Sequence, residues 1–209
     1  MADHIFDHPE VSAAFRYASQ WWRSLVGAVD DQVWDRAALG EWSVRELVAH
    51  GDRAYKTIVT YAEGHTVDDT EIYSAAGYFR IVLAEETPHV HIAARAKRDA
   101  ADHDDWVSAT DDMASSAEKL VTGLAPDHTM HLLVGEMQLD QYLATRVVEL
   151  VTHGLDLAAA IDLPTAAPSD SARVALTVLL DLATDDDLSS ITRLLTGRAA
   201  SLPLTHVLD

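Results

Sequence analysis

DQYLATRVVELVTHGLDLAAAID, residues 140–162, is the stretch around which the rest of the chain must be arranged. Its apolar residues recur at helical spacing, which predicts one long amphipathic helix. Glu149 and His153 are four positions apart, so they share a helix face with Cβ atoms roughly 5 to 6 Å apart. Arg146 and Asp156 extend this face in both directions. Because burying unpaired charge is costly, these side chains must pair with each other, bind a metal ion or line a wet pocket.

The overall composition indicates a globular, largely helical protein, which we expect in the cytoplasm. Of its 209 residues, 48% are hydrophobic, enough to bury one good core. No apolar run approaches the roughly 18 to 20 residues of a membrane-spanning helix, and the start lacks the order of a signal peptide. The net charge of -19 would repel nucleic acids and anionic membranes. We therefore expect that the protein binds neither nucleic acid nor membranes. We expect it to be a monomer or a homodimer.

Sulfur chemistry in this protein would need an external thiol. The chain contains no cysteine, which removes disulfides, thiolate zinc sites and a cysteine nucleophile. A thiol would have to enter as a cofactor or a substrate.

Three further helices are expected before the opening stretch, at residues 9–29, 44–63 and 89–124, the last open to a break at the acidic residues 100–105. Ser43 and Glu46 form a capping box at the start of the second helix. Residues 64–88 are interpreted as an irregular segment with room for a short helix, and residues 128–137 as a short strand or loop.

Four long helices predict an all-α, up-and-down four-helix bundle over residues 1–163. Residues 164–209 are predicted to be a short C-terminal extension, helical at 171–183 and 188–195 and then extended. In such bundles, metal sites are built from side chains on facing helices. The tryptophans are expected in the core rather than on a stacking surface, and they occupy positions 21, 22, 34, 42 and 106.

His50 suggests a metal site that includes Glu149 and His153. It lies on the second predicted helix, which can face the fourth in a bundle. Two histidines and one carboxylate leave a coordination position open, as in catalytic zinc and non-haem iron sites. Asp156 would then be an outer partner of a ligand or a general base. The alternative is that Glu149 and His153 form an ordinary helix-surface ion pair, worth about 0.2–0.5 kcal/mol.

Two segments resemble the signature segments of the mycothiol-dependent maleylpyruvate isomerase family, a branch of the DinB-like metalloproteins. They are WSVRELVAH at 42–50 and RVVELVTHGLDL at 146–157, and the similarity extends over most of residues 10–162. The resemblance implies a DinB-like four-helix bundle in which His50, Glu149 and His153 bind a divalent metal, usually zinc. It also implies mycothiol as the thiol cosubstrate, and the residues themselves do not distinguish mycothiol from bacillithiol or glutathione.

The leading functional hypothesis is a metal-dependent mycothiol S-transferase acting on a small electrophile. Metal binding would lower the thiol pKa from about 8.5, and the thiolate would attack an electrophilic carbon. If the sulfur left again after bond rotation, the outcome would be maleylpyruvate-type cis-trans isomerisation. Transfer is preferred because the resemblance implies that the isomerases have a larger C-terminal domain that supplies an arginine. Arg193 or Arg198 could substitute for it here, but a surface role is the expectation for both. The third hypothesis is a non-catalytic metal-binding helical module.

Four residues are assigned to the reaction or to the thiol. Arg80 is expected to hold the acceptor substrate through a bidentate contact to a carboxylate, with an ion pair on a loop as the equal alternative. Asp156 is expected to accept the thiol proton or to orient His153. Arg146 and Tyr78 are expected to bind the thiol cosubstrate.

Overall fold

The computed structural model describes residues 2–64, 70–84, 96–199 and 201, and these are mostly helical. The helices are α1 His8–Val26, α2 Val44–Gly51, α3 Arg53–Ala62, α4 Ala75–Leu83, α6 Trp106–Gly123, α7 Leu139–Ala160, α8 Ser169–Leu182 and α9 Asp185–Leu195. Two small antiparallel hairpins pair β1 Ala37–Leu39 with β2 Trp42–Ser43, and β3 Thr129–Leu132 with β4 Gly135–Gln138. The predicted all-α, DinB-like bundle is confirmed. Within the described ranges, no helix combines the length and apolar character needed to cross a membrane.

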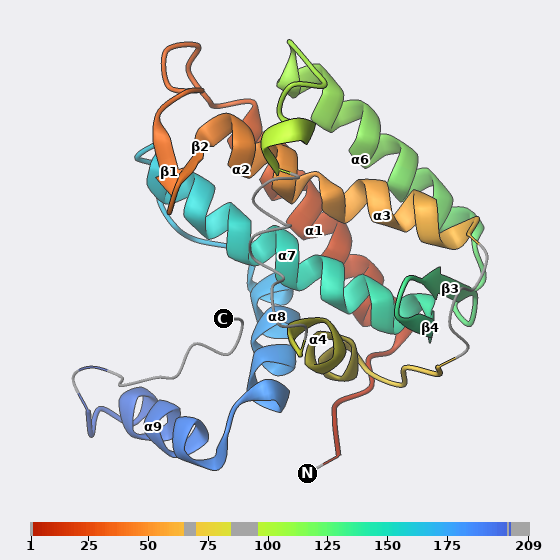
Figure 1. Cartoon of the computed structure of the whole chain (residues 1–209). Coiled ribbons are helices and arrows are strands. Elements are labelled where there is room, and N and C mark those ends of the chain that lie inside the picture. The colour runs from red at the N-terminus through yellow and green to blue at the C-terminus, as the bar shows by residue number, and fades with distance from the viewer. Residues whose placement is uncertain (1, 65–69, 85–95, 200, 202–209) are drawn as a thin grey trace.

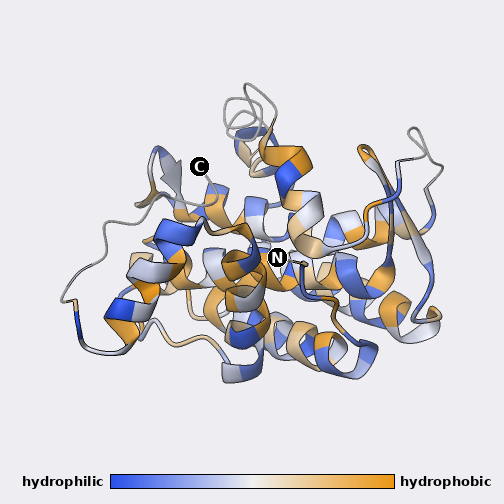
Figure 2. Ribbon diagram, turned by 90° about the horizontal axis from the view of Figure 1, so that it is seen from below, coloured by the Kyte–Doolittle hydropathy of each residue, from blue (hydrophilic) through white to orange (hydrophobic). Residues whose placement is uncertain are grey.

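Helix α7 lies at the centre of the molecule (Figure 1). Helix α1 packs on α7 and α6, and α3 packs on α6 and α7, so the bundle consists of α1, α2 with α3, α6 and α7. Fourteen of the 22 residues of α7 are buried, which exceeds the single stripe of a surface helix. The other helices carry both hydrophobic and hydrophilic residues, as amphipathic helices do (Figure 2). The polar residues of α7 therefore lie close to the core.

The second predicted helix, over residues 44–63, is in fact two helices that meet at Asp52. The Asp52 side chain is completely buried, and its carboxylate accepts hydrogen bonds from Trp22 Nε1 at 2.8 Å and Thr110 Oγ1 at 2.5 Å. These donors come from α1 and α6, so Asp52 ties the junction to two neighbouring helices. The periodicity of residues 44–63 does not reveal this break, because the apolar positions continue across it.

Several local predictions agree with the structure. The capping box is present, with Glu46 N donating to Ser43 Oγ at 3.3 Å and Ser43 N donating to Glu46 Oε2 at 2.8 Å. Helix α6 begins after Asp105, whose side chain accepts from Ser108 N, so the break expected in the acidic stretch is real. The strand or loop expected at 128–137 is the β3–β4 hairpin, whereas the β1–β2 hairpin was not predicted. Residues 89–95 of the third predicted helix lie outside the described residues.

Helix α8 shares the core of the bundle. It packs on α1 and α7, where Val174, Ala175 and Val178 join the central hydrophobic cluster. Ser171 Oγ donates a hydrogen bond to the carbonyl of Ala14 at 2.7 Å. Helix α9 lies beyond the end of α8 (Figure 1). The domain boundary predicted after residue 163 falls in the connection between α7 and α8 and stays a prediction.

Candidate metal centre

Side chains from two helices meet beside the middle of α7. His50 lies one residue before the end of α2, and Glu149 and His153 lie one turn apart on α7. One donor atom from each of the three lies within 4.8 Å of the other two. Glu149 Oε2 is 3.3 Å from His153 Nε2, and the rings of His50 and His153 are edge-to-face with centroids 4.7 Å apart. The structure therefore brings together the three predicted metal ligands.

Asp156 is the outer partner of His153. Its Oδ2 lies 3.5 Å from His153 Nδ1, at the outer limit of hydrogen-bond length. The buried Nδ1 has no hydrogen bond of good geometry within the described residues. The two ring nitrogens point in different directions, so Nδ1 faces Asp156 while Nε2 faces Glu149 and the shared site. Carboxylate–histidine–metal triads use this arrangement to fix the tautomer of the ligand.

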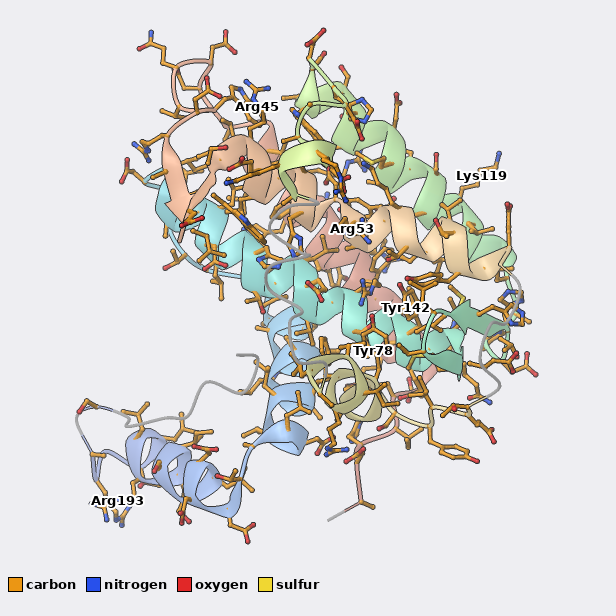
Figure 3. The ribbon with its side chains drawn as sticks, in the orientation of Figure 1. Arg45, Arg53, Tyr78, Lys119, Tyr142 and Arg193 are labelled. Atoms are coloured by element: carbon orange, nitrogen blue, oxygen red, sulfur yellow. The ribbon has the colours of Figure 1, made fainter. Side chains whose placement is uncertain are left out.

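Arg146 is the charged neighbour of Glu149, as Asp156 is of His153. Its Nη2 lies 4.0 Å from Glu149 Oε1, and its side chain is only 6% exposed. Nη1 donates to Thr57 Oγ1 at 3.3 Å. The guanidinium lies over the rings of Tyr142 and Tyr78, at 4.7 and 5.8 Å from their centroids, where α4 faces α7 (Figure 3). Arg146 is thus a buried cation beside the carboxylate, held by aromatic faces and a hydroxyl.

The two candidate ligands on α7 have opposite charges at neutral pH. Burial raises the pKa of Glu149. The hydrogen bond from His153 and the nearby positive charges, Arg146 first, lower the pKa by a larger amount, so that its net value is about 2. Burial lowers the pKa of His153, but Asp156 and Glu149 raise it to about 9. Without a metal, the stable state is therefore a carboxylate beside an imidazolium. A metal ion would take the place of the proton on Nε2.

The donor set fits a divalent metal ion. Zinc binds histidine nitrogen and carboxylate oxygen at about 2.0–2.2 Å, which places tetrahedral donors roughly 3.3 to 3.6 Å apart. The 3.3 Å separation of Glu149 Oε2 and His153 Nε2 already has this value. The donor atoms of all three side chains lie within 4.8 Å of one another, so the side chains need to move only slightly closer together to bind an ion. Three protein donors leave a fourth position for an external ligand.

Trp42 packs against the core, as predicted, but it also contacts the candidate metal ligands, which was not predicted. Its half-buried ring, on β2, lies 4.7 Å from the ring of His50 and 6.4 Å from that of His153, measured between centroids. Trp42 belongs to the same motif as His50. However, their spacing crosses a boundary between strand and helix, so helical periodicity could not place the two rings together. The turn between β1 and β2 brings the indole to the histidine.

Arg80 points away from Tyr78 and from Arg146. It forms a bidentate ion pair with Asp3, with contacts of 2.7 and 2.9 Å, and donates to the carbonyl of Asp181 at 2.6 Å. Residues two apart on a helix point about 200° apart. Tyr78 therefore faces Arg146, whereas Arg80 faces the N-terminal segment and the end of α8. The partner of Arg80 is a carboxylate of the chain itself, as in the ion-pair alternative, although Arg80 lies on helix α4 and not on a loop.

Arg193 and the other paired histidines of the described chain have different surroundings. Arg193 lies on α9, away from α7 (Figure 3). His8 pairs with Asp140 at 2.6 Å, and His131 pairs with Glu136 at 3.1 Å. In the part of the chain that the structure describes, His50, Glu149 and His153 form the one group able to hold a metal ion.

Comparison with known proteins identifies the family of the chain. The model of the mycothiol maleylpyruvate isomerase N-terminal domain matches residues 15–158, more than half of the chain. The matched region includes all three candidate ligands as well as Trp42, Arg146 and Asp156. No curated protein and no solved structure matches the chain. On the extent of the family match, the chain belongs to the mycothiol maleylpyruvate isomerase N-terminal domain family.

Proposed function

We propose that this protein is a metal-dependent enzyme that joins the sulfur of a small thiol, mycothiol, to an electrophilic substrate. The observation that carries the proposal is the convergence of His50, Glu149 and His153 on one point from two helices. Each ligand on α7 also has a charged partner three residues away on the same helix. Outer partners of this kind are typical of metal sites and unnecessary for a simple surface ion pair. The family name supplies mycothiol as the thiol.

The chain's own residues have distinct parts in this chemistry. A divalent ion such as Zn²⁺, held by His50, Glu149 and His153, would lower the pKa of a bound thiol from about 8.5. Asp156, whose Oδ2 lies 3.5 Å from Nδ1 of His153, favours the tautomer that keeps the proton on Nδ1 and so leaves Nε2 available for coordination. Arg146 stabilises the ionised form of Glu149.

Tyr78 and Trp42 are the aromatic surfaces next to the site. Trp42 packs against His50, which holds the imidazole plane in place. Tyr78 is half-buried beside Arg146, whereas Arg146 itself is almost inaccessible. We therefore assign contact with the thiol cosubstrate to Tyr78, and we assign to Arg146 an indirect part through Glu149.

The surroundings of Arg80 favour transfer over isomerisation. Both reactions form a bond between the thiol sulfur and an electrophilic carbon, but in isomerisation the sulfur leaves again after rotation. A maleylpyruvate-type substrate carries two carboxylates, which require cationic partners. Arg80, the arginine predicted to supply one, is already paired with Asp3. An uncharged electrophile needs no such partner, so S-transfer is the preferred outcome.

The test measures metal content and turnover in the same preparations. Zinc-loaded protein is mixed with mycothiol and chlorodinitrobenzene, and the thioether and released chloride are quantified. A parallel reaction offers maleylpyruvate and follows its isomerisation. We expect one metal per chain, conjugate formation, and loss of both in His153→Ala and Glu149→Ala, which should remain folded. His131→Ala, a histidine variant on the β3–β4 hairpin, should retain both.

Three results would redirect the proposal. Isomerisation without conjugate would assign the family's isomerase reaction to this chain. Bound metal without turnover with mycothiol, bacillithiol or glutathione would leave a non-catalytic metal-binding module. Absence of stoichiometric metal from the intact protein would remove the basis of the enzymatic interpretation.

A further inference from the structure

Two consecutive tryptophans on α1 contact the two helices that carry the metal ligands. The ring of Trp22 lies against the backbone of α2 at Gly51, and the ring of Trp21 lies against α7 at Gly154. A Cβ atom at either glycine would lie under 3.0 Å from the facing ring, closer than real Cβ atoms come. The two rings therefore occupy the space that a side chain at these positions would need.

Each of these glycines directly follows a candidate ligand in the sequence, Gly51 after His50 and Gly154 after His153. Both lie in helices and neither has a positive φ, so the backbone conformation does not require glycine. In a helix interior, glycine costs roughly 1 kcal/mol relative to alanine. The close approach of an indole is the feature that accounts for glycine at both positions.

Trp22 is held rigidly within this arrangement. Its side chain is completely buried, and Nε1 donates to Asp52 Oδ1 at 2.8 Å. Asp52 in turn accepts from Thr110 on α6. Trp21 is anchored through the same stretch of α1, because neighbouring Cα atoms are about 3.8 Å apart and their side chains diverge by about 100°. One rigid segment of α1 thus touches both ligand-bearing helices.

We propose that Trp21 and Trp22 form a tryptophan bracket that sets the spacing of α2 and α7 and so positions His50 relative to His153. The inference rests on the proposed metal site. Metal–donor distances are held within about 0.2 Å of their ideal values in functional sites. A shift between α2 and α7 far smaller than the thickness of a ring would therefore alter coordination. Neither tryptophan needs to touch the ion, so both are positioning residues.

The test perturbs the bracket from both sides without replacing a ligand. Gly154→Ala adds a Cβ that pushes against Trp21, and Trp21→Leu removes the ring without creating a clash. The double variant relieves the clash, so it should recover part of the loss caused by Gly154→Ala. Gly123→Ala is the matched control, because Gly123 ends α6 and a Cβ there would meet nothing within 4 Å.

The readouts are metal affinity and coordination geometry, both independent of turnover. Zn²⁺ affinity is measured by competition with a chromophoric chelator, and the visible absorption of the Co²⁺-substituted protein reports donor geometry. Circular dichroism of the metal-free protein establishes that each variant is folded. We expect Gly154→Ala and Trp21→Leu to lose on the order of tenfold to a hundredfold in Zn²⁺ affinity, the range seen when outer supports of a site are removed. Their Co²⁺ spectra should change, and Gly123→Ala should match the wild type.

The outcomes separate this inference from the proposed function. Wild-type affinity and an unchanged Co²⁺ spectrum in folded Trp21→Leu would overturn the bracket while leaving the metal site in place. This variant decides the matter even if Gly154→Ala does not fold, because it introduces no clash. A double variant as weak as the sum of the two single losses would also count against a direct ring–backbone contact. Failure of the wild-type protein to bind metal would overturn the proposed site and the bracket together.

Discussion

Metal binding should depend steeply on pH, because the ion must displace a proton from His153. Burial lowers the pKa of His153, but Asp156 and Glu149 raise it to about 9 in the metal-free protein. Below that pH the imidazole is protonated and cannot coordinate, so affinity should fall as the pH falls. Glu149, with a pKa of about 2, stays ionised over the working range and adds no dependence of its own.

The size of the loss in apparent metal affinity follows from the difference between the pKa of His153 and the working pH. At pH 7 the pKa of about 9 lies two units higher, so about one imidazole in a hundred is neutral. The apparent affinity at pH 7 should therefore be about 100-fold below its high-pH limit, which is on the order of 3 kcal/mol. Between pH 6.5 and 8.5 it should rise about tenfold per unit, with release of about one proton for each ion bound.

Two measurements check this prediction. Competition titrations at constant ionic strength give the apparent affinity at each pH, and calorimetry in buffers of different ionisation enthalpy counts the released protons. Asp156→Asn removes a contact that raises the pKa of His153, so the plateau should begin at lower pH. A flat profile between pH 6.5 and 8.5 would refute the reasoning. An unchanged plateau in Asp156→Asn would refute the part assigned to that carboxylate.

Three further predictions concern the supports of the site. Burial raises the pKa of Asp52 to about 7, so the metal-free fold should lose stability as pH rises from about 4 to about 7. This increase of about three units in the pKa of Asp52 corresponds to on the order of 4 kcal/mol. In urea-unfolding measurements, Asp52→Asn should flatten the dependence of stability on pH in this range, and an equally steep dependence in the variant would contradict the prediction. Ser43→Ala should cost about 1 kcal/mol in thermal unfolding through loss of the α2 cap, whereas Ser116→Ala, whose hydroxyl only bonds a carbonyl one turn back, should cost less. Arg146→Met should weaken Zn²⁺ binding by about 10–100-fold, whereas Arg80→Met should leave it unchanged. Equal effects of the two variants in a chelator competition would rule out a specific role of Arg146 in supporting Glu149.

The features that the sequence alone determined are local ones. The helix over residues 140–162, the capping box of Ser43 and the shared face of Glu149 and His153 depend on residues at most one helical turn apart. Their geometry follows from the helical repeat, which is the same in any fold. The predicted bundle then suggested His50 as a third candidate ligand and the family resemblance agreed with it, although periodicity alone could not connect His50 to the other two.

The tertiary structure decided which distant side chains meet. Three examples are the contact between the tilted rings of Trp42 and His50, the break of the second helix at Asp52, and the ion pair of Arg80 with Asp3. Each involves residues whose distance depends on how helices and hairpins pack. A helical repeat defines which face a side chain occupies but not what lies opposite that face. Whether two histidines come close enough to share an ion therefore depends on how α2 packs against α7, which the sequence of either helix does not define by itself.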